Sequence, residues 1–220
     1  MNDEYETRRI KMVEDDIYSR GIREDSILNA MKSIVRHEFV PEKYKDAAYS
    51  DRPLPIGYGQ TISQPYIAAL MVSMLKVEKT DKILEIGAGS GYLAAILSLL
   101  CNQVYAVEII PELVEIAKKT LEKINIHNVT VINGDGNYGW QEQAPYDGII
   151  VSAASTTIPP ILFEQLVEGG RLIAPVGDPG FQILELWYKK DESYTKETGI
   201  PVSFVPLVSK KNNDVPQNTD

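Results

Sequence analysis

Hydrophobic and polar positions follow two different patterns in this chain, and the pattern changes near residue 80. From residue 82 onward, short apolar runs alternate with amphipathic stretches, which is typical of β-strands alternating with α-helices. We expect strands at 82–87, 103–108, 128–133, 146–154, 169–177 and 181–189, and helices at 92–100, 111–124 and 158–166. Such an alternation predicts an α/β fold with a mostly parallel twisted sheet and helices on both faces.

The chain before residue 80 predicts helices and one irregular segment. Apolar residues recur at helical spacing within 4–36, and Arg20-Gly21 divides this stretch into two helices. Four prolines and two glycines between Pro41 and Pro65 leave little room for regular structure. A segment of that length is usually functional or disordered, and its Ile, Leu and Tyr residues argue against disorder.

These patterns divide the chain into three parts. Residues 1–80 comprise the N-terminal helical segment and the proline- and glycine-rich segment, both packed on the core. Residues 81–208 form that core, and the polar residues 209–220 predict a flexible tail. At 220 residues and 44% hydrophobic composition, the chain can bury one sizeable core.

Charge and cysteine content exclude several classes of function. With 22 Lys and Arg against 31 Asp and Glu, the net charge of −9 argues against nucleic acid and anionic membranes as partners. The polar N-terminus shows no secretory signal, and a single cysteine, Cys101, fits a reducing compartment. We therefore expect a cytoplasmic protein, and we expect it to be monomeric. His37 and His127 have no Cys or second His at ligand spacing, so we expect no metal.

A glycine-rich loop, EIGAGSG at 85–91, follows the first core strand and opens a helix. Its glycines have the spacing G-x-G-x-G, and Tyr92 stands where a dinucleotide-binding fingerprint has glycine. Glu108 ends the next strand, and Gly134-Asp135-Gly136 follows the third. One such loop alone can be a tight turn without a ligand, but three pieces at consecutive strand ends favour a binding site. The set resembles the S-adenosylmethionine site of Rossmann-like class I methyltransferases, whose product is S-adenosyl-L-homocysteine.

The stretch before the loop, AYSDRPLPIGYGQTISQP at 48–65, narrows the resemblance. It is similar to a block of the protein-L-isoaspartate (D-aspartate) O-methyltransferase family. RHEFVP at 36–41, GDGNYGW at 134–140, APYDGIIVSAA at 144–154, LVEGGRLIAPVG at 166–177 and FVPLV at 204–208 resemble further blocks in the same order. The resemblance covers about residues 25–208 of the chain.

The resemblance implies transfer of a methyl group from S-adenosylmethionine to the free carboxylate of L-isoaspartyl residues in damaged proteins and peptides. It implies Ser63 as the active-site serine. It implies as cofactor-binding residues Gln60, Thr61, Ile62, Glu85, Gly87, Ala88, Gly89, Glu108, Ile109, Asp135 and Gly136. A carboxylate acceptor is already ionised at neutral pH, so the reaction needs no general base, and Ser63 is expected to orient the acceptor.

Other interpretations stay open at the level of sequence. Ser63 precedes an apolar helical run and could cap that helix, a role compatible with catalysis. Tyr49 and Tyr58 are candidates for contact with a peptide because functional residues concentrate in loops. The alternative functions are a methyltransferase acting on a small-molecule carboxylate or hydroxyl, and a non-catalytic S-adenosylmethionine-binding module. A nucleotide-dependent oxidoreductase is disfavoured by Tyr92.

Overall fold

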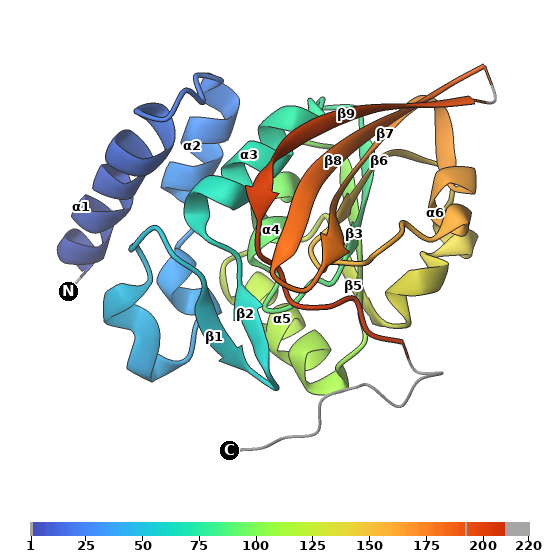
Figure 1. The fold of residues 1–220 in the computed structure, drawn as a ribbon. Coiled ribbons are helices and arrows are strands. Elements are labelled where there is room, and N and C mark those ends of the chain that lie inside the picture. Colours follow the sequence, from blue (N-terminus) through green and yellow to red (C-terminus); the bar gives the residue numbers. More distant parts are fainter. Residues whose placement is uncertain (1, 192, 210–220) are drawn as a thin grey trace.

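A seven-stranded sheet with the strand order β5-β4-β3-β6-β7-β8-β9 forms the centre of the computed structural model, which describes residues 2–191 and 193–209 (Figure 1). A separate two-stranded sheet pairs β1 with β2. The strands are β1 Leu54–Gly57, β2 Gln60–Ile62, β3 Lys82–Ile86, β4 Gln103–Glu108, β5 Val129–Asn133, β6 Tyr146–Val151, β7 Leu166–Asp178, β8 Phe181–Lys190 and β9 Ser193–Val202. The helices are α1 Asn2–Met12, α2 Asp25–Ser33, α3 Pro65–Leu75, α4 Tyr92–Ser98, α5 Pro111–Lys123 and α6 Pro160–Glu164.

The predicted fold class is confirmed by this architecture. Strands β3 to β7 are mutually parallel along the sheet, and only β8 and β9 run antiparallel to their neighbours. Each strand and helix expected after residue 81 is present, with ends shifted by a few residues, as local patterns usually allow. Of the expected tail, only Ser209 lies within the described residues.

Two parts of the chain are more regular than the sequence predicts. The proline- and glycine-rich segment contains the β1–β2 hairpin, whose turn places Gly57, Tyr58 and Gly59 at positive φ. The sequence analysis also missed β9, which pairs along β8 with a register shift between Ile183 and Glu185. Both elements are short or largely exposed, so their apolar periodicity is weak.

The sheet separates two hydrophobic cores because side chains alternate between its faces. In β3, Ile83 packs into the larger core with α2 to α5, whereas Leu84 packs with Leu162 of α6 on the other face. The larger core also includes Met12, Val13 and Ile17 from the N-terminal helical segment. In Figure 1, α1 and α2 accordingly lie on one side of the molecule and α6 on the opposite side of the sheet.

The reversal of strand order positions the functional region. From β3 the chain builds outward through β4 and β5, and it then returns to place β6 on the other side of β3. In open α/β sheets, ligands bind beyond the carboxyl ends of the strands at such a reversal. The residues after Ile86 and Val151 are therefore expected to border a crevice.

None of the described helices combines the length and the apolar character needed to cross a membrane.

The larger core makes a direct prediction about stability. Leu97 of α4 is completely buried, whereas Leu99, two residues later, is 37% exposed. We expect Leu97→Ala to lower the free energy of unfolding by about 2–5 kcal/mol, because the substitution leaves a cavity. The same truncation at Leu99 is expected to cost about 1 kcal/mol, because this side chain is only partly buried. Denaturant titration of both variants measures the difference, and equal losses would contradict the burial described for Leu97.

Candidate active site

The glycine-rich loop forms a tight turn between β3 and α4. Gly87 and Gly89 have φ angles of +81° and +53°, which residues other than glycine rarely adopt. The backbone N–H groups of Gly87 and Ala88 both donate to the carbonyl of Val107 on β4, at 2.8 and 3.2 Å. A Cβ atom added to Gly89 would lie 3.1 Å from Ile56 Cδ1 of the β1–β2 hairpin. The loop is therefore held closely against both the sheet and the hairpin.

Glu108, at the end of β4, is tied into this loop. It is 5% exposed, and its Oε2 accepts a hydrogen bond from the Gly89 N–H at 2.8 Å. Its Oε1 accepts one from the Ile110 N–H at 3.0 Å. Burial raises the pKa of Glu108, and these backbone hydrogen bonds oppose the rise. Each carboxylate oxygen can accept a second hydrogen bond, so a ligand hydroxyl could still bind here.

Glu85, near the end of β3, is also buried, but its carboxylate is less fully hydrogen-bonded than that of Glu108. It is 1% exposed, its Oε1 lies 3.5 Å from the Ser152 hydroxyl, and its buried Oε2 has no hydrogen-bond partner among the described residues. Burial raises the pKa of Glu85 well above its ordinary value, and the nearby Glu108 carboxylate raises it further. A buried carboxylate with an unused oxygen is costly unless a donor or a cation completes it. This site therefore suits the positively charged part of a ligand.

Asp135 and Gly136, the third part of the predicted cofactor site, have different surroundings. A Cβ atom on Gly136 would lie 2.4 Å from Ile86 Cγ2, so only glycine fits beside the end of β3. The Asp135 carboxylate accepts hydrogen bonds from the Asn137 N–H and side-chain amide, and from the Ser209 hydroxyl. Asp135 does not line the cavities that the described residues form at this edge. Its predicted contact with the adenine amino group stays a prediction.

Two connected cavities at the carboxyl edge of the sheet contain the other predicted cofactor residues. The first, here called the cofactor cavity, is lined by Gln60, Thr61, Ile86, Gly87, Gly89, Val107, Glu108, Ile109, Gly136, Ser152, Ala153 and Val205–Val208. The second, here called the inner cavity, is lined by Thr61, Ile62, Ser63, Ala68, Glu85, Gly87, Ala88, Gly89, Ser90, Tyr92, Leu93 and Ser152. Together they offer two carboxylates and a close approach to the backbone. These acceptor groups fit the ammonium and ribose groups of S-adenosylmethionine.

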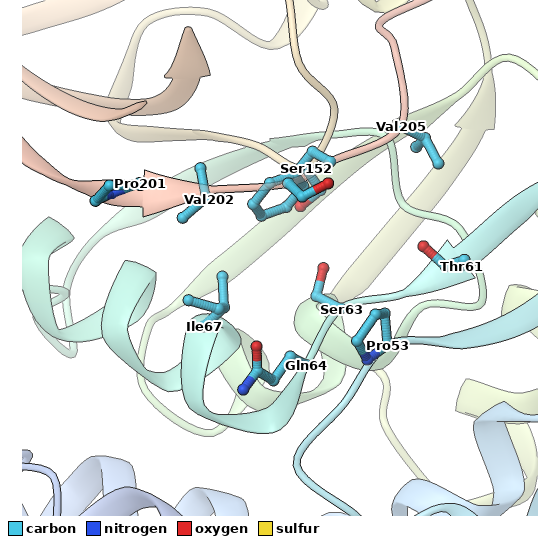
Figure 2. Close-up of a pocket in the computed structure, with 11 residues that line it drawn as sticks. Pro53, Thr61, Ser63, Gln64, Ile67, Ser152, Pro201, Val202 and Val205 are labelled. Carbon is cyan, nitrogen blue, oxygen red and sulfur yellow. The ribbon is translucent and has the colours of Figure 1, made fainter. Parts of the chain in front are cut away.

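A third cavity, of about 380 Å³, adjoins these two and opens between α3 and the end of β9. This acceptor cavity is lined by Pro53, Thr61, Ser63, Gln64, Ile67, Ser152, Pro201, Val202, Ser203, Phe204 and Val205. Figure 2 shows the Ser63 side chain pointing into it from the start of α3, with Ser152 on the opposite wall. Among the described lining residues none is charged, so hydroxyl groups, backbone groups and the Gln64 amide are the polar groups that can contact a ligand.

Ser152 is a functional candidate that the sequence analysis missed. It lines all three cavities, as does Thr61, so these two side chains lie where the cavities meet. The available signal was its position, because it directly follows β6 at the carboxyl edge of the sheet. The family resemblance did not single out Ser152, because this serine lies inside the longer matching stretch APYDGIIVSAA at 144–154.

The structure excludes two of the alternatives that the sequence left open for the proline- and glycine-rich segment. Ser63 does not cap α3: Gln64 occupies the N-cap, and the Asp51 carboxylate accepts from the Tyr66 N–H at 2.9 Å. Tyr49 is 6% exposed, and its hydroxyl hydrogen-bonds to His37 Nδ1 at 2.7 Å, so it cannot serve as a peptide-contact residue. In both cases a partner distant in sequence determines the role.

Comparison with known proteins identifies the family. The model of the protein-L-isoaspartate (D-aspartate) O-methyltransferase family matches residues 7–212. The chain belongs to this family. The protein-L-isoaspartate O-methyltransferase of Methanospirillum hungatei is 49% identical over 92% of this chain and 94% of its own length. The Dictyoglomus thermophilum enzyme of the same name is 50% identical over 93% of this chain and 92% of its own.

Solved structures agree with this assignment. A protein-L-isoaspartate O-methyltransferase structure superposes with a TM-score of 0.84 at 32% identity, covering 93% of this chain and 66% of that one. A Plasmodium falciparum protein described as the same kind of enzyme, in complex with S-adenosyl-L-homocysteine, superposes with a TM-score of 0.79 at 26% identity. That match covers 91% of this chain and 98% of the other.

The family assignment confirms the enzyme class and the cofactor that the sequence predicts. The chain is an S-adenosylmethionine-dependent protein-L-isoaspartate O-methyltransferase, an enzyme of protein repair. This favours the repair reaction over a small-molecule methyltransferase, a non-catalytic binding module or an oxidoreductase. The role of each site residue is a separate question, which the geometry has to answer.

The raised pKa of Glu85 gives a prediction with a defined sign. The folded chain holds a proton at Glu85 at pH values where the unfolded chain has lost it, so this group makes folding less favourable as pH rises through that interval. We expect cofactor-free Glu85→Gln to melt at a higher temperature than the parent at about pH 8, with a smaller difference at about pH 4. We also expect about tenfold weaker binding of S-adenosylmethionine, because a charge-assisted contact is lost.

Thermal melts with and without the cofactor measure both effects. Glu115→Gln on α5 is the matched control, because its carboxylate is exposed and lines none of the three cavities. Unchanged cofactor affinity in Glu85→Gln would contradict a ligand contact at this carboxylate. An unchanged or lower melting temperature of cofactor-free Glu85→Gln at about pH 8 would contradict the burial of Glu85 with an unpaired carboxylate oxygen.

Proposed function

We propose that Ser63 orients the isoaspartyl carboxylate in the acceptor cavity for methylation from the inner cavity. The observation that carries this proposal is the position of Ser63, which lines both cavities and points its hydroxyl into the acceptor side (Figure 2). A carboxylate bound there would lie next to the predicted cofactor residues. The reaction itself is that of the family.

The chemistry asks little of the protein beyond orientation. The acceptor carboxylate has an ordinary pKa of about 4, so it is ionised at neutral pH and needs no general base. The cofactor supplies a methyl group on a positively charged sulfur, which is a good leaving group. The Ser63 hydroxyl would donate to one carboxylate oxygen and leave the other free to attack. A hydroxyl donor holds the carboxylate without withdrawing as much charge as a guanidinium would.

We assign the cofactor side by the same matching of groups. Glu108 would accept hydrogen bonds from the ribose hydroxyls of the cofactor. Glu85 would lie at the amino-acid end of the cofactor, whose ammonium group would donate to the unpartnered Glu85 oxygen. Gly87, Gly89 and Gly136 would allow the ligand to approach the backbone. Residues 81–208 would thus supply most of the cofactor side, and both parts of the chain would supply the acceptor side, with Ser63 coming from residues 1–80.

The partners follow from the cavity and from the charge of the chain. We propose that the enzyme acts as a monomer in the cytoplasm, on isoaspartyl residues in many different sequences. The cavity opens at the end of β9, where an extended peptide could lie along the backbone of residues 201–205. The net charge of −9 offers no attraction to nucleic acid or to an anionic membrane.

The role of Ser63 can be tested with methyl-labelled S-adenosylmethionine and two synthetic peptides that differ only in one isoaspartyl or aspartyl residue. We expect base-labile label on the isoaspartyl peptide alone. Ser63→Ala should lower kcat by about 10- to 100-fold, because orientation of the carboxylate is lost. The Kd for S-adenosylmethionine should change by less than about twofold, since the cofactor contacts remain.

Ser73→Ala is the matched control, because Ser73 lies on α3, which follows Ser63, donates to Glu24 and lines none of the cofactor, inner and acceptor cavities. It should leave kcat unchanged. An equal loss of cofactor binding in Ser63→Ala would show that Ser63 is structural. Label on the aspartyl peptide would remove the assigned selectivity.

A further inference from the structure

The Ser63 hydroxyl has no hydrogen-bond partner of its own among the described residues, so its position depends on the backbone that carries it. Ser63 lies between β2, which ends at Ile62, and α3, which begins at Pro65. Its surroundings on the acceptor side are uncharged. Whatever fixes this short connection therefore fixes the hydroxyl, and two charged side chains from the preceding forty residues hold it.

Arg36 holds the backbone of Ser63 directly. It is completely buried, and its Nη2 donates to the Ser63 carbonyl at 2.8 Å, while its Nε donates to the Ala48 carbonyl at 2.8 Å. Its guanidinium also lies 4.6 Å from the centre of the Tyr92 ring, and Tyr92 is the first residue of α4 after the glycine-rich loop. Arg36 thus connects the acceptor serine with the helix that the cofactor loop opens.

Stability alone explains Arg36 poorly. None of the described carboxylates lies within ion-pair distance of its guanidinium, and its buried Nη1 has no hydrogen-bond partner in the described chain. A buried charge with incomplete hydrogen bonding costs folding free energy. An apolar side chain of similar volume would fill the core without burying a charge. What Arg36 adds is a fixed set of hydrogen bonds to three carbonyls, one of which is that of Ser63.

Asp51 holds the residues that follow Ser63. Its Oδ1 accepts from the Tyr66 N–H at 2.9 Å, which caps α3, and its Oδ2 accepts from Gln64 Nε2 at 2.6 Å. Arg20 completes the arrangement: its Nη1 lies 2.9 Å from Asp51 Oδ2, and its guanidinium covers the Tyr66 ring at 3.3 Å. Asp51 thus fixes the chain on the C-terminal side of Ser63, and Arg36 fixes Ser63 itself.

We propose that Arg36 and Asp51 are positioning residues for catalysis, which fix the Ser63 hydroxyl at the acceptor cavity through the Ser63 carbonyl and through the residues that follow it. The inference rests on the role proposed for Ser63. Neither side chain lines the acceptor cavity, so neither touches the acceptor. Their contribution is the precision of the orientation, and a displacement of about 1 Å in such a group can cost about a hundredfold in rate.

A double-mutant cycle with Ser63→Ala separates positioning from general stability. Asp51→Asn keeps an oxygen for the Tyr66 N–H but loses its charge, and Arg36→Lys keeps its charge but loses the fork of donors. We expect each to lower kcat about 10- to 100-fold with the isoaspartyl peptide, and to change the Kd for S-adenosylmethionine by less than about twofold. In the Ser63→Ala background, each should change kcat by less than about twofold, because no hydroxyl remains to be positioned.

Asp147→Asn is the matched control. The Asp147 carboxylate also accepts a backbone N–H, that of Lys82, but at the amino end of β3, the opposite edge of the sheet from the cavities. It should lower the melting temperature and leave kcat unchanged in both backgrounds. If Arg36→Lys does not fold, the cycle is completed with Asp51→Asn and with Arg20→Met, whose parent side chain is 44% exposed. We expect Arg20→Met to lower kcat about two- to fivefold.

Each outcome decides between distinct conclusions. Equal losses of kcat with and without the Ser63 hydroxyl would overturn the positioning roles and leave the role of Ser63 intact. Full activity of Ser63→Ala itself would overturn the role proposed for Ser63, and the positioning roles with it. Losses confined to the melting temperature would show that Arg36 and Asp51 only stabilise the fold.

Discussion

The reversal of strand order between β3 and β6 is the constraint on which the rest of this structure depends. Both strands point their carboxyl ends at the same edge, and the chain leaves them toward different neighbours. The loop after Ile86 leads into α4. The residues after Val151 instead pair with the C-terminal segment, where the Ala154 N–H donates to the Val205 carbonyl. A crevice must open between these two departures. The three cavities lie in it, and Ser152 lies where they meet.

Two buried carboxylates in that crevice show how binding capacity and stability oppose each other. Glu108 receives two backbone N–H groups, so the fold itself compensates its burial. The Ser152 hydroxyl lies 3.5 Å from one Glu85 oxygen, and the other oxygen lacks a hydrogen-bond partner in the described chain. A ligand that donates a hydrogen bond to the unpartnered Glu85 oxygen removes the free-energy cost of leaving it unpaired. Such a ligand stabilises the folded state by more than the rest of its contacts would provide. The uncompleted carboxylate therefore favours a positively charged ligand over a neutral one.

The sequence predicted the cofactor half far better than the acceptor half, for physical reasons. Strands such as β3 and β4 are buried by neighbours on both sides, so their apolar runs and terminal glycines are visible locally. The helix cap at Tyr66 comes instead from Asp51, fifteen residues earlier, and the role of Tyr49 depends on His37 and Arg9. Ser63 looked like a cap because serine often is one before a helix. Only tertiary contacts could show otherwise.

The lack of charge in the acceptor cavity connects this long-range packing to catalysis. An arginine in the cavity would hold a carboxylate by two strong, charge-assisted hydrogen bonds. A serine hydroxyl makes one weaker bond, so its usefulness depends on how accurately the scaffold presents it. In this chain the scaffold includes Arg36 and Asp51, and the N-terminal helical segment packs into the same core as α4. Under the roles proposed for Ser63, Arg36 and Asp51, packing far from the acceptor contributes to rate.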